Sequence, residues 1–357
     1  MTTDNERRKK LVKWLDKLLK QLRSLMVATY FKAIEELRDR IAAGEDFVWN
    51  ENGTQEKRIM DLLKTLQGKI NLLIASGVSN FYAEGLADAA DQINKALEND
   101  KFKFKKERLK DLKVSATESR RQEAVAGHAE TVSYRGGAMN NLSNRVWDFK
   151  KQAKEEIEQI VQTAISKGQG VQEAKNSVKE FLNTDENGEM KHGGKPGVYK
   201  KPEKNCERLI RTETTAAYRS AEIDMYQKSN MVLGFEIHLS GNHYTKRGKK
   251  EPKPLHDICD ELAGIYPKDF YWTGWHPNCR CYITPVTMTP DQFGKYLDAK
   301  KAGKVDEYLD SIRVKDYPDK FKKYFASHAD KLAKKPPQWV KNNTSTLPKL
   351  PQNSEQK

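Results

Sequence analysis

Histidine and cysteine side chains gather in one stretch of the chain, at a spacing that could bind a metal ion. His256 is followed three positions later by Cys259, and His276 is followed by Cys279 and then by Cys281. The two segments read H-x2-C and H-x2-C-x-C, and a gap of two residues lets both side chains of a pair reach one ion. Sixteen residues separate Cys259 from His276, which is typical of structural zinc modules. These five residues are therefore candidate zinc ligands. Two His–Cys pairs supply four ligands, so one of the cysteines would be left over.

Three interpretations of this cluster stay open on the sequence alone. The fourth cysteine, Cys206, stands apart, and the concentration of the other three in one segment favours a zinc site. Histidine and cysteine also serve as metal-free core residues, and a redox or catalytic thiol is the third alternative. A site with four protein ligands has no open position, so zinc here would be structural rather than hydrolytic.

Motifs of known enzyme classes do not fit the chain, and we expect a protein without enzymatic activity. Zinc-dependent base deaminases carry H-x-E and P-C-x2-C motifs, whereas Ile258 stands two residues after His256 and Asn278 follows Pro277. A Walker loop, an H-E-x2-H helix and a G-x-S-x-G elbow are also absent from the sequence. Residues 211–213 (Arg-Thr-Glu) would suit ADP-ribosyl transfer, but we favour an ordinary Arg–Glu pair on a helix.

The elements around the cluster are expected to form a small α+β module. Residues 206–229 predict a helix with a narrow face of small side chains, and residues 232–239 alternate as a β-strand does. A second strand is expected at 282–286, directly after the last cysteine. His238 falls on the alternate face of the first strand, so we expect it to be a surface or packing residue.

Helices are expected to dominate the rest of the chain. Residues 11–26 and 59–97 carry apolar side chains at three- and four-residue steps, with a break at 50–54 and a bend near Gly77. A helix–Gly–helix pattern covers residues 142–182. The predicted fold class is therefore mostly α with a C-terminal α+β module, and its helical N-terminal part is expected to be elongated.

The chain is expected to divide into three parts. Residues 1–135 would form a helical N-terminal region, and residues 136–287 would contain the His/Cys cluster. Residues 288–357 would form a basic tail of short helices that is disordered from Asn342 onward. The clearest loop is the stretch 185–203, which is rich in Gly, Lys, Pro and Asn.

The charge balance favours an anionic partner. The 357 residues carry a formal net charge of +14, and 37% of them are hydrophobic while 32% are charged. Such a balance favours contact with nucleic acid, an anionic membrane or an acidic protein, although solubility alone would also explain it. A basic run with interleaved phenylalanines is a weak nucleic-acid candidate, and its lysines are Lys101, Lys103, Lys105 and Lys106. A solvated helix face would explain the same run.

The sequence shows neither a secretory signal nor a membrane span. Charged residues follow Met1 closely, and the chain holds no apolar run near the ~20 residues that a membrane span needs. We therefore expect synthesis in a cytoplasm, where the cysteines stay reduced or bind a metal ion.

Several of these motifs together resemble the phage Mu F-like minor head protein family of tailed bacteriophages. The resemblance covers residues 142–286 and includes the helix–Gly–helix pattern near its start. It also includes residues 211–213 on a helix, the strand that follows, and residues 275–281 (Trp-His-Pro-Asn-Cys-Arg-Cys) before the next strand. The sequence departs from the family pattern in two long polar segments, 185–203 and 242–254.

This resemblance implies a minor capsid or head-morphogenesis protein that acts in head assembly, DNA packaging or genome delivery. The implied partners are the portal protein, capsid proteins and packaged double-stranded DNA, the last through non-specific phosphate contacts. The implied location is the virion, at the capsid interior or the portal vertex, after synthesis in the host cytoplasm. Two other classes stay open: a zinc-stabilised nucleic-acid-binding module, and an ADP-ribosyltransferase-like or nuclease enzyme.

Overall fold

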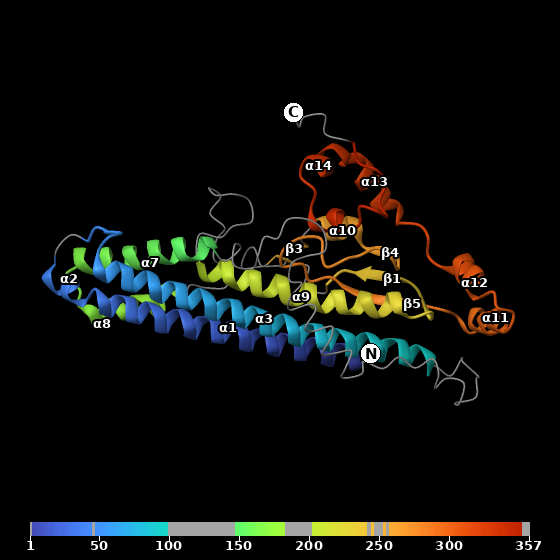
Figure 1. The fold of residues 1–357 in the computed structure, drawn as a ribbon, viewed down its shortest axis with the longest axis horizontal. Helices are drawn as coiled ribbons and strands as arrows, with labels where there is room; N and C mark the ends of the chain where they lie inside the picture. The colour runs from blue at the N-terminus through green and yellow to red at the C-terminus, as the bar shows by residue number, and fades with distance from the viewer. Residues whose placement is uncertain are drawn as a thin grey trace. The chain divides into compact units, whose positions relative to one another are not determined.

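A computed structural model describes residues 2–44, 47–98, 147–182, 202–240, 244–245, 253–254 and 257–351. The chain, drawn as a ribbon in Figure 1, forms two compact units. The first unit comprises Met1–Gly77 and Ala138–Glu213, and the second comprises Val78–Gly137 and Thr214–Lys357. Each unit therefore combines segments that are far apart in the sequence. The predicted boundary between residues 135 and 136 lies outside the described residues.

The first unit is built from helices. They are α1 (Thr2–Glu36), α2 (Arg38–Ala43), α7 (Trp147–Ser166), α8 (Val171–Leu182) and the N-terminal parts of α3 (Thr54–Leu97) and α9 (Pro202–Lys228). Of the apolar stripe predicted over residues 11–26, Leu19, Leu22 and Met26 are buried, and the buried face continues along α1 to Tyr30 and Ile34. Gly168, with a φ of 61°, lies in the predicted turn between α7 and α8.

Helix α3 continues through Gly77, where the sequence predicts a bend. The apolar positions on either side keep helical spacing and are buried, namely Ile70, Ile74, Val78 and Phe81. A glycine inside a helix costs only about 1 kcal/mol relative to alanine. Burial of this apolar face therefore outweighs the weak helix propensity of a single glycine.

In the second unit, α3 and α9 contact each other along their C-terminal parts. The Tyr82 hydroxyl on α3 donates a hydrogen bond to the Asp224 carboxylate on α9 at 2.7 Å. The two backbones approach closely at Gly85, because a Cβ atom there would lie 2.4 Å from the carbonyl oxygen of Tyr218. These contacts fix the part of α9 that carries Arg219.

A three-stranded antiparallel sheet forms the β part of the second unit. Its strands, in spatial order, are β4 (Gly264–Pro267), β1 (Val232–His238) and β5 (Tyr282–Thr287). The two strands predicted from the sequence are β1 and β5, and they are neighbours, with Ile237 opposite Ile283. A separate two-stranded ladder joins β2 (Tyr244–Thr245) and β3 (Lys253–Pro254). The predicted fold class, mostly α with a C-terminal α+β module, is therefore confirmed.

Short helices complete the second unit. They are α10 (Ile258–Leu262), α11 (Pro290–Lys301), α12 (Val305–Ile312), α13 (Asp319–Ser327), α14 (Ala329–Lys334) and α15 (Gln338–Lys341). The ring of Phe321 on α13 lies 5.4 Å from that of Tyr266 on β4, and the ring of Trp339 on α15 lies 5.5 Å from that of Trp275. The C-terminal helices therefore share one aromatic core with the sheet and with the loop before β5.

A buried asparagine anchors the segment after α15. Asn343 is 1% exposed, and its side-chain oxygen accepts a hydrogen bond from the Tyr271 N–H at 2.6 Å. Its side-chain NH2 group donates to the carbonyl oxygens of Tyr271 and Trp339 at 2.8 Å and 2.7 Å. The sequence predicts disorder from Asn342 onward. Up to residue 351 the structure differs, because this polar side chain is a core residue that satisfies buried backbone groups.

Candidate metal centre

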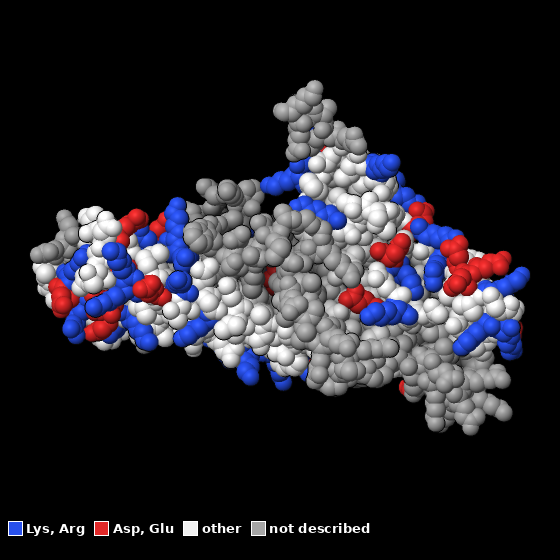
Figure 2. All heavy atoms as spheres, in the orientation of Figure 1, with Lys and Arg blue, Asp and Glu red and all other residues white. Residues whose placement is uncertain are grey.

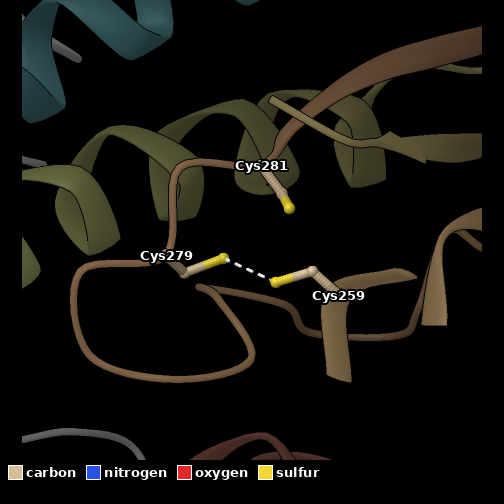
Figure 3. A group of neighbouring side chains, drawn as sticks. All are labelled: Cys259, Cys279 and Cys281. Carbon is tan, nitrogen blue, oxygen red and sulfur yellow. Dashed lines mark hydrogen bonds between the residues drawn. The ribbon is translucent and has the colours of Figure 1, made fainter. Parts of the chain in front are cut away.

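Three cysteine thiols converge in the second unit (Figure 3). The sulfur atoms of Cys259, Cys279 and Cys281 all lie within 4.8 Å of one another, and those of Cys259 and Cys279 are 3.8 Å apart. All three residues are buried, with exposed fractions of 5% or less. Thiolates are ligands that soft metal ions prefer. The cluster could therefore hold a metal ion.

Cys259 is positioned by the N-terminal cap of α10. The Asp257 carboxylate accepts a hydrogen bond from the Cys259 N–H at 2.7 Å. The Asp260 carboxylate in turn accepts from the Asp257 N–H at 2.9 Å, which completes a capping box. This reciprocal cap fixes the first turn of the helix and, with it, the direction in which the Cys259 thiol points.

The other two cysteines lie in the loop that enters β5. The Cys279 N–H donates to the His276 carbonyl oxygen at 3.1 Å, which closes a turn through Pro277 and Asn278. Asn278 has a φ of 60°, a left-handed conformation that asparagine tolerates better than most residues. After this turn, Cys279 and Cys281 are two residues apart and both thiols point toward Cys259 (Figure 3).

His276 lies beside Cys259 in an orientation that suits metal binding. Its Nδ1 atom is 2.8 Å from the carbonyl oxygen of Pro277, and because a carbonyl only accepts, Nδ1 carries the proton. The other ring nitrogen, Nε2, is 3.1 Å from the Cys259 sulfur and 3.4 Å from a carboxylate oxygen of Asp257. In the neutral ring Nε2 holds the lone pair that a metal ion needs, and a bond from Nδ1 to a carbonyl commonly orients metal-binding histidines.

A buried arginine on α9 binds the backbone of the same loop. The Arg219 guanidinium donates to the carbonyl oxygens of Cys279 at 2.7 Å, Cys281 at 2.6 Å and Thr273 at 2.8 Å. It also lies over the ring of Trp272, 4.6 Å from the centroid. Only 3% of Arg219 is exposed. A single side chain therefore holds the loop at both ends of the turn that carries His276.

Gly274 leaves the space that Arg219 occupies. Its φ is +130°, a conformation that residues with a side chain rarely adopt. A Cβ atom at this position would lie 2.7 Å from Nη1 of Arg219 and 3.2 Å from Cβ of Cys279. The close approach of the arginine to the loop therefore depends on glycine at this position.

The three thiols hold their protons unequally. Hydrogen bonds with Cys259 and Cys281, aided by the charge of Arg219, hold the pKa of Cys279 well below its usual range. Hydrogen bonds with Cys279 and Cys281, together with burial, raise the pKa of Cys259. The bond with Cys259 lowers the pKa of Cys281, but the bond with Cys279 and burial outweigh it and raise this pKa to about 12. A further cation is therefore needed before all three can be thiolates together.

The geometry fits a tetrahedral, sulfur-binding ion. Zn–S bonds of about 2.3 Å place two sulfur ligands about 3.8 Å apart at the tetrahedral angle, and the Cys259 and Cys279 sulfurs are separated by 3.8 Å. Magnesium and calcium ions take oxygen ligands, which three cysteines do not supply. Nε2 of His276 would complete a set of three sulfurs and one nitrogen, which is common in structural zinc sites.

The structure brings together four of the residues that the sequence singles out. Cys259, Cys279 and Cys281 meet directly, and His276 contacts Cys259. The fifth candidate, His256, lies outside the described residues. The sequence leaves one cysteine of the Cys-x-Cys pair as a spare, but the structure places both sulfurs in the cluster.

The remaining candidates from the sequence do not join this cluster. Lys101, Lys103, Lys105 and Lys106 lie outside the described residues, so their contact with nucleic acid stays a prediction. Cys206 belongs to the first unit, where burial and the neighbouring Glu203 raise the pKa of its thiol. A thiol that holds its proton this firmly is a poor nucleophile.

His238 is a packing residue, as the sequence predicts. Its Nε2 atom lies 2.7 Å from the hydroxyl of Thr284 across the β1–β5 ladder, and its ring stacks on Tyr282. Sequence reasoning missed two residues of the site, Asp257 and Arg219. An aspartate just before a short helix is a recognisable capping signal, whereas nothing in the local sequence marks Arg219.

Charges of both signs mark the face of the molecule shown in Figure 2. Lysine and arginine side chains alternate with aspartate and glutamate, both where α7 and α8 lie and over the C-terminal helices. The described parts of this face therefore carry mixed charge rather than a field of one sign. None of the described helices is long and apolar enough to cross a membrane.

Comparison of the chain with protein-family models, with curated proteins and with solved structures finds no match.

Proposed function

We propose that the second unit is a structural module stabilised by zinc. The observation that carries this proposal is the convergence of three buried cysteine sulfurs, two of them at the separation that tetrahedral zinc requires. The ligands are Cys259, Cys279, Cys281 and Nε2 of His276, which is 3.1 Å from the Cys259 sulfur. Four protein ligands close the coordination sphere, so the ion stabilises the fold and leaves no position for a substrate.

The ion would join two elements that are separate in the chain. Cys259 comes from the first turn of α10, whereas the other three ligands come from the loop that enters β5. Without the ion, this part of the core consists of three thiols and an imidazole in place of apolar side chains. Binding of the ion is then coupled to folding, so loss of the metal lowers the free energy of unfolding.

Metal content and thermal melting of the purified chain test this role. We expect one zinc ion per chain and a large loss of melting temperature when a chelator is added. Cys279→Ser should lower both the zinc content and the melting temperature, whereas Cys206→Ser, in the first unit, should leave the zinc content unchanged. A chain that carries no metal and melts at the same temperature with and without chelator would refute the zinc site.

We further propose that the chain is a non-enzymatic minor head protein of a tailed bacteriophage, acting in head assembly, DNA packaging or genome delivery. Two features of the sequence favour this role. The segment 275–281 resembles the corresponding segment of the phage Mu F-like minor head proteins, and the net charge is +14. The partners would be the portal protein, capsid proteins and packaged double-stranded DNA, at the capsid interior or the portal vertex of the virion. A charge of this size suits salt-dependent, sequence-independent contact with phosphates.

The salt and sequence dependence of DNA binding separates this role from that of a sequence-reading zinc module. Phosphate contact predicts that affinity falls steeply as salt rises and is equal for two duplexes of the same length and unrelated sequence. A preference for one duplex that persists at high salt would instead indicate contacts with base edges. Absence of binding at low salt would contradict the DNA-proximal role altogether.

The head-protein role also predicts where the chain is found. Phage heads assembled with their portal and capsid proteins and then purified should contain the chain in few copies, as measured by quantitative mass spectrometry. Heads that form normally and contain none of it would contradict this role. Catalytic turnover that Glu213→Ala abolishes while the fold stays intact would favour the enzyme alternative.

A further inference from the structure

Arg219 is a buried cation whose hydrogen-bond acceptors in the described part of the chain are all backbone carbonyl oxygens. Its guanidinium donates to the carbonyl oxygens of Thr273, Cys279 and Cys281 and lies over the ring of Trp272. Within the described part of the chain, no carboxylate forms an ion pair with it. Removing a charge from water is costly unless an opposite charge compensates it. A buried guanidinium that binds the backbone of Cys279 and Cys281 therefore calls for one net negative charge on the neighbouring thiol cluster.

A metal centre at the thiol cluster can supply that charge, depending on its ligands. A divalent ion with three thiolates and one neutral imidazole carries one net negative charge, whereas two thiolates and two imidazoles give a neutral centre. Only the centre with three thiolates has the single negative charge that balances the positive charge of the Arg219 guanidinium. Since Arg219 binds the backbone of two of the three cysteines, the two charges would lie next to each other in a buried, low-dielectric site.

We infer that Arg219 is the counter-charge of a metal centre with three thiolate ligands. The inference rests on the proposed zinc site and deepens it, because it fixes the ligands as Cys259, Cys279, Cys281 and His276 and excludes a two-histidine set that includes His256. Arg219 is a positioning residue here, since it acts on the metal through the ligand loop. Its two roles, holding the loop and balancing the charge, can be separated by substitution.

Arg219→Lys and Arg219→Gln form a matched pair for this purpose. Both side chains are shorter than arginine and both can donate to the loop carbonyls, but only lysine carries a charge. Zinc affinity of the full chain would be measured by competition with a chromophoric chelator. We expect zinc affinity to fall about 100-fold in the glutamine variant and about 10-fold or less in the lysine variant. These values lie in the range found when residues that orient metal ligands are substituted. Equal affinities for the two variants would overturn the charge role.

Cobalt substitution gives a second test that does not depend on the arginine variants. The intensity of the sulfur-to-cobalt charge-transfer band scales with the number of thiolate ligands. Cys281→Ser should therefore remove about one third of this intensity from a three-thiolate centre. An unchanged intensity would show that Cys281 is not a ligand and would overturn the inference, even if neither arginine variant folds.

The outcomes also separate this inference from the proposed zinc site. A wild-type chain that takes up neither zinc nor cobalt would refute both. A wild-type chain that binds one zinc ion while the lysine and glutamine variants bind it equally well would refute only the role of Arg219.

Discussion

Replacing Gly274 by alanine should destabilise the second unit strongly, because two separate costs act at one position. The φ of +130° is a region in which a residue with a side chain is strained by about 1–3 kcal/mol. The new Cβ atom would also lie 2.7 Å from Nη1 of Arg219, so the guanidinium would have to move. That movement weakens the hydrogen bond to the Thr273 carbonyl, and bonds of charged groups contribute about 1.5–3 kcal/mol. The expected loss in free energy of unfolding is about 2.5–6 kcal/mol.

Gly294 in α11 provides a matched control. A Cβ atom there would have nothing within 4 Å, and the residue lies inside a helix, where replacing glycine by alanine gains about 0.5–1 kcal/mol. The two substitutions therefore add the same methyl group with opposite expected effects. Any general effect of the added side chain would appear in both variants.

Hydrogen exchange of the zinc-loaded chain measures the difference locally. In Gly274→Ala, peptides that cover β4, the ligand loop and β5 should exchange faster than in wild type, because local opening becomes less costly. In Gly294→Ala the same peptides should exchange at the wild-type rate. If Gly274→Ala retains both wild-type exchange and wild-type zinc content, the reasoning about the arginine and its glycine is wrong.

Two further substitutions test contacts elsewhere in the second unit. Burial and the charge of Arg313 lower the pKa of Lys268 from 10.5 to about 8 in the folded chain. The folded chain therefore binds the Lys268 proton more weakly than the unfolded chain does, and this lowers the free energy of unfolding most strongly below pH 8. Lys268→Met removes this proton but also the hydrogen bond from Lys268 Nζ to the Ser229 carbonyl oxygen at 3.1 Å, so the test is the pH dependence. Between pH 7 and 10.5 the stability of wild type relative to Lys268→Met should rise by about 1 kcal/mol in thermal melts, after allowance for solvent screening. Asn343→Ala leaves buried groups of Tyr271 and Trp339 without their partner, and should cost about 3 kcal/mol in urea unfolding.

The helices could be predicted because their apolar residues recur at the helical period and the structure buries them. The stripe on α1 illustrates this, since its four-residue spacing alone defines the buried face. Strand β4 was missed because Gly264–Pro267 is short and contains both glycine and proline, which weaken any strand signal. It becomes a strand by pairing with β1, with Ile265 opposite Glu236. Such tertiary pairing leaves no trace in the local sequence.

The candidate site could be predicted only as far as local spacing reaches. The spacing marks two ligand pairs, His256 with Cys259 and His276 with Cys279. The structure brings Cys259, Cys279 and His276 together, whereas His256 lies outside the described residues. The contribution of Cys281 depends on the direction of its thiol after the turn at Asn278, which spacing does not give. Arg219 was missed because its contact with the loop depends on where α9 lies in the second unit, and a lone arginine on a helix has no distinctive pattern.

Whether His276 is a permanent ligand distinguishes a structural zinc ion from a catalytic one. The three cysteines are buried, whereas His276 is the partly exposed ligand, so it is the one that an incoming molecule could replace. A closed structural site predicts that His276→Ala lowers zinc affinity by more than the roughly 10–100-fold typical of outer-shell changes, because a direct ligand is lost. It also predicts that azide leaves the cobalt spectrum of the wild-type chain unchanged.

An open site predicts the reverse of both results. His276→Ala would then bind zinc as tightly as wild type, and azide would shift the wild-type cobalt spectrum by entering the fourth position. The hydrogen bond that fixes the proton on Nδ1 favours the closed site, because it holds the ring with its lone pair on Nε2, the nitrogen nearest Cys259. A ring held in this way loses little further freedom when it binds the ion, which is what a permanent ligand requires.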